Sequence, residues 1–176
     1  MSRPGPTLCP AVKRIFLVAC VAAVAALGAQ PPPPAARQEL DFWLGDWEVF
    51  VDGKFDGTNR IERVLGGAAL IENWHDADGH EGKSWFYFYP PENRWKQVWV
   101  TDAGGVKEKA LTGRLPNGAV QFRGEVQLRD GRNILDRTTL TPLADGTVRQ
   151  VIELSADGGA NWKKGYDAIY RRKKLP

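Results

Sequence analysis

Cysteine and histidine are scarce in this 176-residue sequence. The cysteines are Cys9 and Cys20, and the histidines are His75 and His80. Because both cysteines precede residue 29, a chain cleaved after Gly28 has no disulfide, no thiol nucleophile and no cysteine metal ligand. Such a chain depends on its core for stability, and about 148 residues are enough for one domain.

The chain after residue 28 also has no net charge. Residues 1–28 hold three of the 24 Lys and Arg and none of the 21 Asp and Glu, which leaves 21 basic against 21 acidic residues. A balanced chain of this kind carries no electrostatic footprint for nucleic acid or for an anionic membrane surface. We therefore expect neither of these as a partner.

The sequence has one long apolar run, and it lies near the start. Ile15–Ala29 follows two basic residues and spans about fifteen residues, which is shorter than the roughly twenty of a membrane-spanning helix. Small residues before position 29 predict a signal peptide at 1–28 and a periplasmic or secreted protein. The alternatives are a retained N-terminal anchor and a lipoprotein attached through Cys20.

Proline is concentrated just after this leader. Pro31–Pro34 favours an extended polyproline stretch, so we interpret 29–38 as a linker. The folded domain is then expected at 39–174, with at most a single helical turn at its start, over Glu39–Leu44. The chain after residue 38 has no other sustained helical periodicity.

The domain has an all-β pattern. Short runs of Val, Ile, Thr and aromatic residues alternate with turn residues about every eight to twelve positions. Ten turn pairs predict about ten strands: Asp52-Gly53, Asp56-Gly57, Gly66-Gly67, Asp78-Gly79, Pro90-Pro91, Gly104-Gly105, Asn117-Gly118, Asp130-Gly131, Asp145-Gly146 and Gly158-Gly159. Short consecutive hairpins favour an antiparallel up-and-down barrel, because closure removes the sheet edges.

Several aromatic segments resemble the calycins, the lipocalin-like barrels. Phe42–Val49 (FWLGDWEV) is similar to their Trp-x-Gly-x-Trp opening. Three further runs are similar to a family of uncharacterised exported bacterial calycin-like domains: 67–74, 85–90 and 95–100. The resemblance covers about Asp41–Arg172 and implies a ten-stranded barrel without implying an activity. The nitrobindins are more distant relatives in shape and hold haem through a late histidine. No histidine follows His80, so no haem or other cofactor is expected.

The segment Ser155–Trp162 (SADGGANW) resembles the Asp-box of propeller sialidases. A propeller needs several blades and several such motifs, whereas this chain has one copy between two strand-like runs, 148–154 and 162–170. Asp157 can accept hydrogen bonds from the turn backbone, and the glycines after it can adopt positive φ. The motif therefore predicts a hairpin turn closed by Trp162, and not a glycosidase.

The two histidines lie in the segment His75–His80 (HDADGH). Two imidazoles and two carboxylates within six residues could bind zinc, but their spacing fits no established metal loop. Asp-x-Asp-Gly is also ordinary turn composition. We therefore predict a turn between two strands and no metal site.

The hairpin around Pro90–Asn93 carries the most information. If these four residues form the loop, Tyr89 pairs with Arg94 and the register follows. A loop at 76–82 then adds the preceding strand to the same face. The predicted inward set is Leu70, Glu72, Trp74, Ser84, Phe86, Phe88, Trp95, Gln97, Trp99 and Thr101. The outward set is also apolar and needs a cover, either from Phe42–Leu44 or from a second copy of the chain in a homodimer.

A carboxylate within an aromatic wall is the signal for a site. Burying it unpaired costs several kcal/mol, whereas a ligand cavity is commonly apolar with a few polar groups. The predicted ligand-binding residues, for a small apolar or aromatic molecule, are Glu72, Trp74, Phe86, Phe88, Gln97 and Trp99. The alternatives are a filled core in which Glu72 reaches water or meets Arg123, Arg137 or Arg149, an enzyme with Glu72 as general acid or base, and an envelope protein-interaction module.

Overall fold

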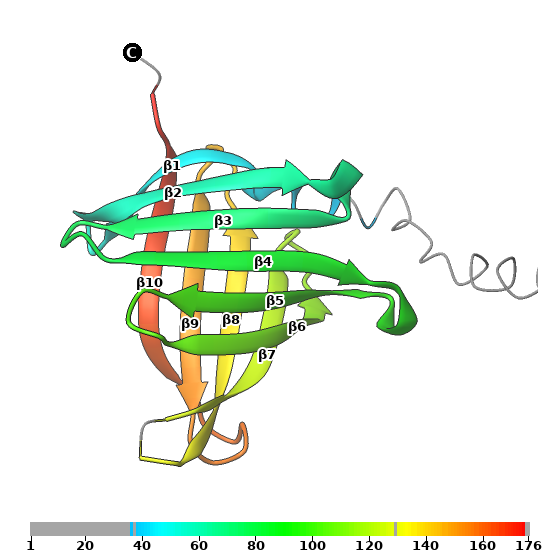
Figure 1. Ribbon diagram of the computed structural model, residues 1–176. Coiled ribbons are helices and arrows are strands. Elements are labelled where there is room, and N and C mark those ends of the chain that lie inside the picture. Colours follow the sequence, from blue (N-terminus) through cyan, green and yellow to red (C-terminus); the bar gives the residue numbers. More distant parts are fainter. Residues whose placement is uncertain (1–35, 37, 129, 175–176) are drawn as a thin grey trace, which may run out of the picture. The chain divides into compact units, whose positions relative to one another are not determined.

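A computed structural model describes residues 36, 38–128 and 130–174. Within these residues ten antiparallel strands form a closed barrel, in which each strand pairs with its neighbours in sequence and β1 pairs with β10 (Figure 1). The strands are β1 Gly45–Val51, β2 Lys54–Val64, β3 Ala69–Asp76, β4 Glu81–Tyr89, β5 Arg94–Thr101, β6 Val106–Arg114, β7 Val120–Gln127, β8 Asn133–Pro142, β9 Val148–Ser155 and β10 Lys163–Arg172. This confirms the predicted all-β, up-and-down barrel, and the architecture is compatible with a calycin-like fold.

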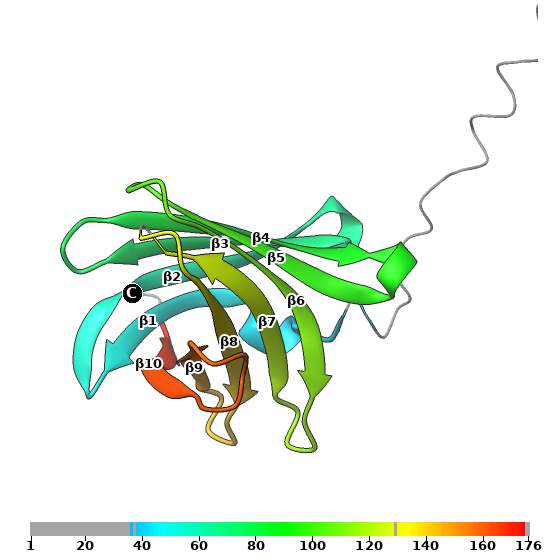
Figure 2. The ribbon, with the colours of Figure 1, turned by 90° about the horizontal axis from the view of Figure 1, so that it is seen from below.

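The strands form two layers around one interior. In Figure 1, β2–β6 run across the view while β8–β10 run down behind them, and Figure 2 shows the two groups on opposite sides of the interior. The pairing shifts between Val49 and Phe50, between Leu111 and Gly113, and between Lys164 and Tyr166. Such bulges bend a strand and increase its twist, which lets a single sheet turn the corner between two layers.

The β4–β5 hairpin has the predicted register. Tyr89 pairs with Arg94, and the short helix η4 (Pro90–Glu92) forms the loop with Asn93 in the left-handed conformation. The preceding loop is shorter than the predicted 76–82, because β3 ends at Asp76 and β4 begins at Glu81. His75 therefore pairs with Glu81, two residues before the position that the predicted loop requires. The difference is an even number of residues, so side-chain alternation is kept and the predicted faces are unchanged.

One of the ten predicted turns is wrong. Asp56 and Gly57 lie inside β2, where Gly57 pairs with Asp76 on β3. A Cβ atom at position 57 would overlap the carbonyl oxygen of His75. The glycine therefore permits close approach of two strands, which is the other common reason for a glycine within a strand. Nine connections join the ten described strands, and the β1–β10 pairing closes the barrel.

Aromatic side chains fill one end of the barrel. The 3-10 helix η2 (Asp41–Trp43), at the expected single turn, inserts Trp43 into the interior, with its ring centroid 5.3 Å from that of Phe86. Phe86 in turn lies 5.4 Å from Phe122, and the indole N–H of Trp47 donates to the carbonyl of Trp43 at 2.8 Å. Edge-to-face contacts of this kind add to the burial of large apolar area. This end of the interior is thus a packed core.

Inward side chains become polar toward the other end of the barrel. On β3 the fully buried Leu70 is followed by Glu72 and Trp74. On β8 the order runs from Leu140 through Thr138 to Asp136, all of them buried. The strands therefore carry packing residues at one end and polar residues at the other.

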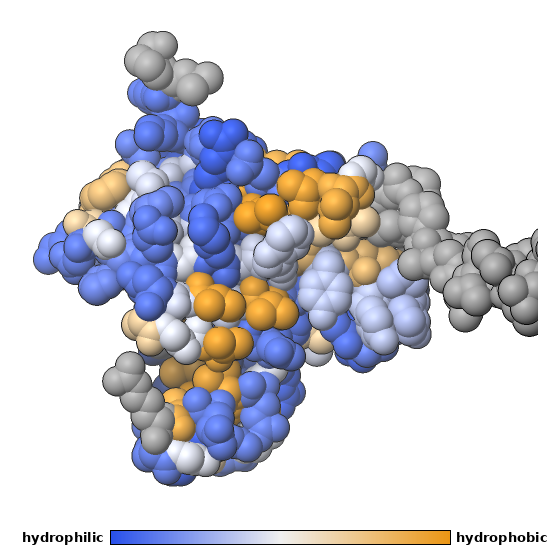
Figure 3. All heavy atoms as spheres, viewed as in Figure 1, coloured by the Kyte–Doolittle hydropathy of each residue, from blue (hydrophilic) through white to orange (hydrophobic). Residues whose placement is uncertain are grey.

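The outer face of β4–β6 is apolar and exposed. Trp85 is 48% exposed, Val100 44% and Val106 55%, and Figure 3 shows apolar residues gathered across the middle of this face. The prediction that Phe42–Leu44 covers this face is wrong. Trp43 lies inside the barrel, and Phe42 and Leu44 pack against the interior core, because the interior buries more of the indole than an outer surface would.

Candidate functional site

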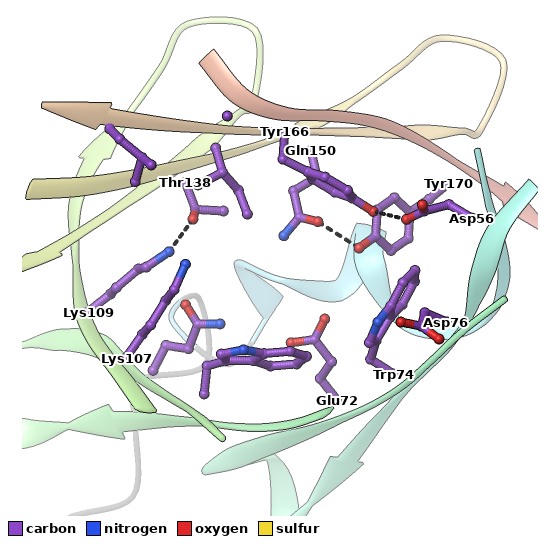
Figure 4. Close-up of a pocket in the computed structure, with 15 residues that line it drawn as sticks. Asp56, Glu72, Trp74, Asp76, Lys107, Lys109, Thr138, Gln150, Tyr166 and Tyr170 are labelled. Atoms are coloured by element: carbon purple, nitrogen blue, oxygen red, sulfur yellow. Dashed lines mark hydrogen bonds between the residues drawn. The ribbon is translucent and has the colours of Figure 1, made fainter. Parts of the chain in front are cut away.

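A cavity opens at the polar end of the barrel (Figure 4). Its volume is about 380 Å³. Side chains from both layers line it: Asp56, Glu72, Trp74, Asp76, Gln97, Trp99, Lys107, Lys109, Thr138, Gln150, Ile152, Leu154, Tyr166 and Tyr170, together with Gly165. The size and the mixture of aromatic and polar groups are those of small-molecule sites in proteins.

Two indoles form the aromatic part of the wall, and each lies over a glycine. A Cβ atom at position 82 would overlap the ring of Trp99, and one at position 57 would lie 2.9 Å from the ring of Trp74. Gly82 pairs with Trp74 across β3–β4, so both glycines stand beside the strands that carry the indoles. The absence of two side chains therefore makes room for two flat rings at the cavity wall.

Glu72 lies at the centre of a buried hydrogen-bond network. The Asn59 amide donates to Oε1 of Glu72 at 2.7 Å, and the Ser84 hydroxyl donates to Oε2 at 2.5 Å. The Gln97 amide N–H donates to the Ser84 hydroxyl at 3.0 Å. Burial raises the pKa of Glu72, while the bonds from Ser84 and Asn59 act in the opposite direction. The carboxyl group is thus fixed in position and protonates more readily than an exposed glutamate.

None of the three arginines considered as alternative partners of Glu72 contacts its carboxylate in the part of the chain that the structure describes. Arg137 pairs with Glu153, and Arg149 pairs with Asp167. Arg123 lies 5.2 Å from the ring centroid of Trp162. These arginines are on outward positions of their strands, so the interior supplies neutral amide and hydroxyl donors to the carboxylate instead.

Two tyrosines form part of the facing wall. The Tyr170 hydroxyl donates to Gln150 at 2.7 Å, and the Tyr166 hydroxyl donates to Asp56 at 2.7 Å near the cavity mouth. Burial raises the pKa of both hydroxyls above the ordinary tyrosine value. Both therefore remain neutral hydrogen-bonding groups at physiological pH.

Two lysines enter the cavity from β6. Nζ of Lys107 lies 2.9 Å from Oδ2 of Asp136, and Nζ of Lys109 lies 2.5 Å from Oδ1 of the same carboxylate. Lys109 also donates to the Thr138 hydroxyl at 2.5 Å. Burial lowers the pKa of Lys109, while the charge of Asp136 acts to raise it. This wall of the cavity is therefore basic.

The structure separates the six predicted site residues into two groups. Glu72, Trp74, Gln97 and Trp99 line the cavity. Phe86 and Phe88 lie on the same inward face but belong to the packed core, where Phe88 stacks edge-to-face on Trp95. Alternation along a strand predicts the face of a side chain and not its depth in the barrel, so these two phenylalanines share the predicted face but do not line the cavity.

Sequence reasoning missed the lysines and the tyrosines of the cavity. Lys107 and Lys109 share the inward face of β6 with Leu111, so alternation contained a signal. Hydropathy alone predicts the opposite orientation of β6, because the apolar Val106 and Ala110 lie on its outward face and the two lysines lie on its inward face. Tyr166 and Tyr170 have four-residue spacing within a regular stretch of β10, so alternation contained a signal for them as well.

The two histidines and the Asp-box segment lie outside the cavity lining, whereas Asp76, between the histidines, is part of it. His75 and His80 are on and beside the β3–β4 loop, with contacts to Glu81 and Asp102. No group of three or more His, Cys, Asp or Glu in the described residues is arranged to hold a metal ion. At the β9–β10 turn, Asp157 accepts from the Asn161 backbone at 2.9 Å and from the Ser155 hydroxyl at 2.7 Å. This is the predicted turn geometry.

The predicted leader and most of the linker lie outside the described residues. In the part of the chain that the structure describes, no helix is long and apolar enough to cross a membrane. No protein-family model and no curated protein matches this chain.

Proposed function

We propose that this chain is an exported single-domain β-barrel that binds a small, largely apolar or aromatic molecule. The supporting observation is the cavity of about 380 Å³ bounded by the indoles of Trp74 and Trp99. A barrel built only for packing would fill this volume with side chains, because empty space forfeits contacts. Here the sequence places Gly57 and Gly82 beneath the indoles, which keeps the volume open.

The polar groups of the cavity support the same proposal. Gln97 is only 7% exposed, and its amide oxygen has no hydrogen-bond partner among the described residues. A buried acceptor without a donor costs about 1–3 kcal/mol. A bound molecule with an N–H or O–H group recovers this energy and also fixes its own orientation.

Binding can be measured with a neutral aromatic probe, N-phenyl-1-naphthylamine, whose fluorescence rises in apolar surroundings. Trp99→Ala should weaken probe binding by about 2–4 kcal/mol, as the loss of a central aromatic anchor often does. The matched control is Trp85→Ala, which removes an exposed indole from the outer face of the neighbouring strand. That change should alter binding by no more than about 0.5 kcal/mol.

Equal effects of the two substitutions would contradict the proposal, because the probe would then be bound without discrimination between the cavity and the outer face. Native mass spectrometry of protein from its own host, followed by identification of any compound that co-purifies, would name the natural ligand.

A second candidate function is catalysis with Glu72 as general acid or base. The observation that favours it is a buried carboxyl group with a raised pKa, held by Asn59 and Ser84 at the wall of an open cavity. Turnover of a bound compound that is lost in Glu72→Gln, with binding of that compound retained, would support catalysis. Retained turnover in this variant would exclude Glu72 from the reaction.

A further inference from the structure

The cavity holds two ammonium groups against one carboxylate on its basic wall. Asp136 is fully buried and contacts Lys107 through one oxygen and Lys109 through the other. Two ammonium groups would bring two positive charges to this wall, and the carboxylate that they share would bring one negative charge. Because charge in a low-dielectric interior is costly without compensation, this wall is the place where an additional negative charge is most stabilised.

The other carboxylates of the cavity accept hydrogen bonds from groups of the protein itself. Glu72 accepts from Asn59 and Ser84, and Asp56 accepts from a tyrosine hydroxyl. Asp76 accepts two backbone N–H groups of the β3–β4 loop, at 2.9 and 2.8 Å. These three carboxylates are hydrogen-bonded by uncharged donors, and among the described residues none of them forms an ion pair with Lys107 or Lys109. Glu72 acts on Lys109 only through the field of its charge. Asp136 is therefore the one carboxylate that both ammonium groups contact directly in this part of the chain.

The surplus charge stands beside the aromatic wall. Across β5–β6, Lys107 pairs with Trp99 and Lys109 pairs with Gln97, so all four side chains project from neighbouring positions of one face. The Lys107 side chain is 34% exposed, which leaves its ammonium group accessible from the cavity mouth. Gln97 lines the same wall.

We infer that the guest of this cavity is a small aromatic molecule with one anionic oxygen group, which the ammonium groups of Lys107 and Lys109 bind while its ring packs on Trp99. This inference rests on the proposed binding function and adds the chemical class of the ligand. Carboxylate, sulfonate and phosphate groups share the required chemistry, since each offers charged oxygen acceptors to the two ammonium groups.

A pair of matched probes tests the charge requirement. N-phenyl-1-naphthylamine and 8-anilinonaphthalene-1-sulfonate have the same aromatic skeleton and the same bridging N–H, and only the second carries an anionic group. Both are titrated by fluorescence into the full folded chain. We expect the dissociation constant of the sulfonate to be lower than that of the neutral probe by at least about tenfold, with a difference that shrinks as salt is added.

Substitution of Lys107 locates the anion. In Lys107→Met the ratio of the two dissociation constants should fall to within about twofold, and in Lys107→Arg it should stay near the original value because the charge is kept. The matched control is Lys96→Met on the outward face of β5, where Lys96 pairs with Glu92. That change should leave the ratio as it is in the unsubstituted protein.

The outcomes separate the two proposals. If the unsubstituted protein binds neither probe, the binding function itself is wrong. If it binds the neutral probe and the sulfonate equally well, binding stands and the anionic class is wrong. A preference for the sulfonate that survives in Lys107→Met also overturns the inference, because the anion then lies elsewhere. Should Lys107→Met fail to fold, Lys107→Arg and the salt dependence still decide the result.

Discussion

Glu72 is the buried carboxyl group that organises the polar half of the cavity. Its two oxygens hold the Asn59 amide and the Ser84 hydroxyl, and Ser84 in turn holds Gln97. Removal of the carboxyl group leaves these buried donors unpaired, so Glu72→Ala is expected to lower stability by about 1–3 kcal/mol. The position is thus structural as well as part of the cavity.

Glu72→Gln gives a sharper prediction because the amide resembles the protonated acid. The folded-state pKa of Glu72 is raised above its ordinary value of 4.5, so the folded protein binds a proton more tightly than the unfolded chain does. The stability that Glu72 contributes is therefore full below about pH 4.5 and is lost as pH rises through the raised pKa. Glu72→Gln has no such loss.

The melting temperature of Glu72→Gln should accordingly rise relative to that of the unsubstituted protein between pH 4 and pH 8. Thermal denaturation followed by circular dichroism measures this difference. Glu125→Gln, at an exposed position of β7, is the control and should show no comparable change. A constant difference for Glu72→Gln across this range would show that its carboxyl group does not titrate as the burial requires.

The β9–β10 turn is stabilised by the hydrogen bonds that the Asp157 carboxylate accepts. Asp157 accepts bonds from the backbone N–H of Asn161, from the Asn161 side chain and from the Ser155 hydroxyl, and these bonds lower its pKa to about 2. Gly158 and Gly159 adopt positive φ, at 72° and 96°. The stabilising charge is present above the ordinary pKa of 3.8 and is lost as pH falls through about 2.

Asp157→Ala should therefore lower the melting temperature at pH 7 by a few degrees, and the difference should shrink as the solution is acidified from pH 5 toward pH 2. Binding of N-phenyl-1-naphthylamine should be unaffected, because this turn does not line the cavity. Asp78→Ala, in the β3–β4 loop, is the control at an exposed turn aspartate. Loss of probe binding in Asp157→Ala would give the motif a functional role instead.

The strands and turns of the barrel were largely predictable from local sequence patterns. Turn residues and alternation predict the strand number and the β4–β5 register, because both depend on neighbours in sequence. Ser84 was on the predicted inward face with Glu72, and the structure joins the two side chains. Asn59 was missed because it comes from β2, whose pairing with β3 was not part of the register argument. Depth along the barrel is equally hidden, which is why Phe86 and Trp99 looked equivalent from alternation alone.

For the whole molecule we propose export with removal of the first 28 residues. The apolar run Ile15–Ala29 has the length of a signal sequence rather than of a membrane-spanning helix. Protein recovered from the cell envelope or medium should begin near Ala29 and carry no lipid, as measured by mass spectrometry. Val18→Arg, which interrupts the apolar run, should leave the chain unprocessed.

An intact Met1 on exported protein would contradict this cleavage, and an acyl group on Cys20 would indicate a lipoprotein.

The packing residues and the cavity residues lie at opposite ends of the barrel. Leu70, Phe86 and Leu140 pack at one end, while Glu72, Trp99 and Asp136 occupy the other. Substitutions at well-separated positions have nearly independent effects on stability. Selection for a new guest can therefore act on the cavity residues while selection for folding acts on others, so descendants of one ancestral barrel can diverge in what they bind and still inherit the same architecture.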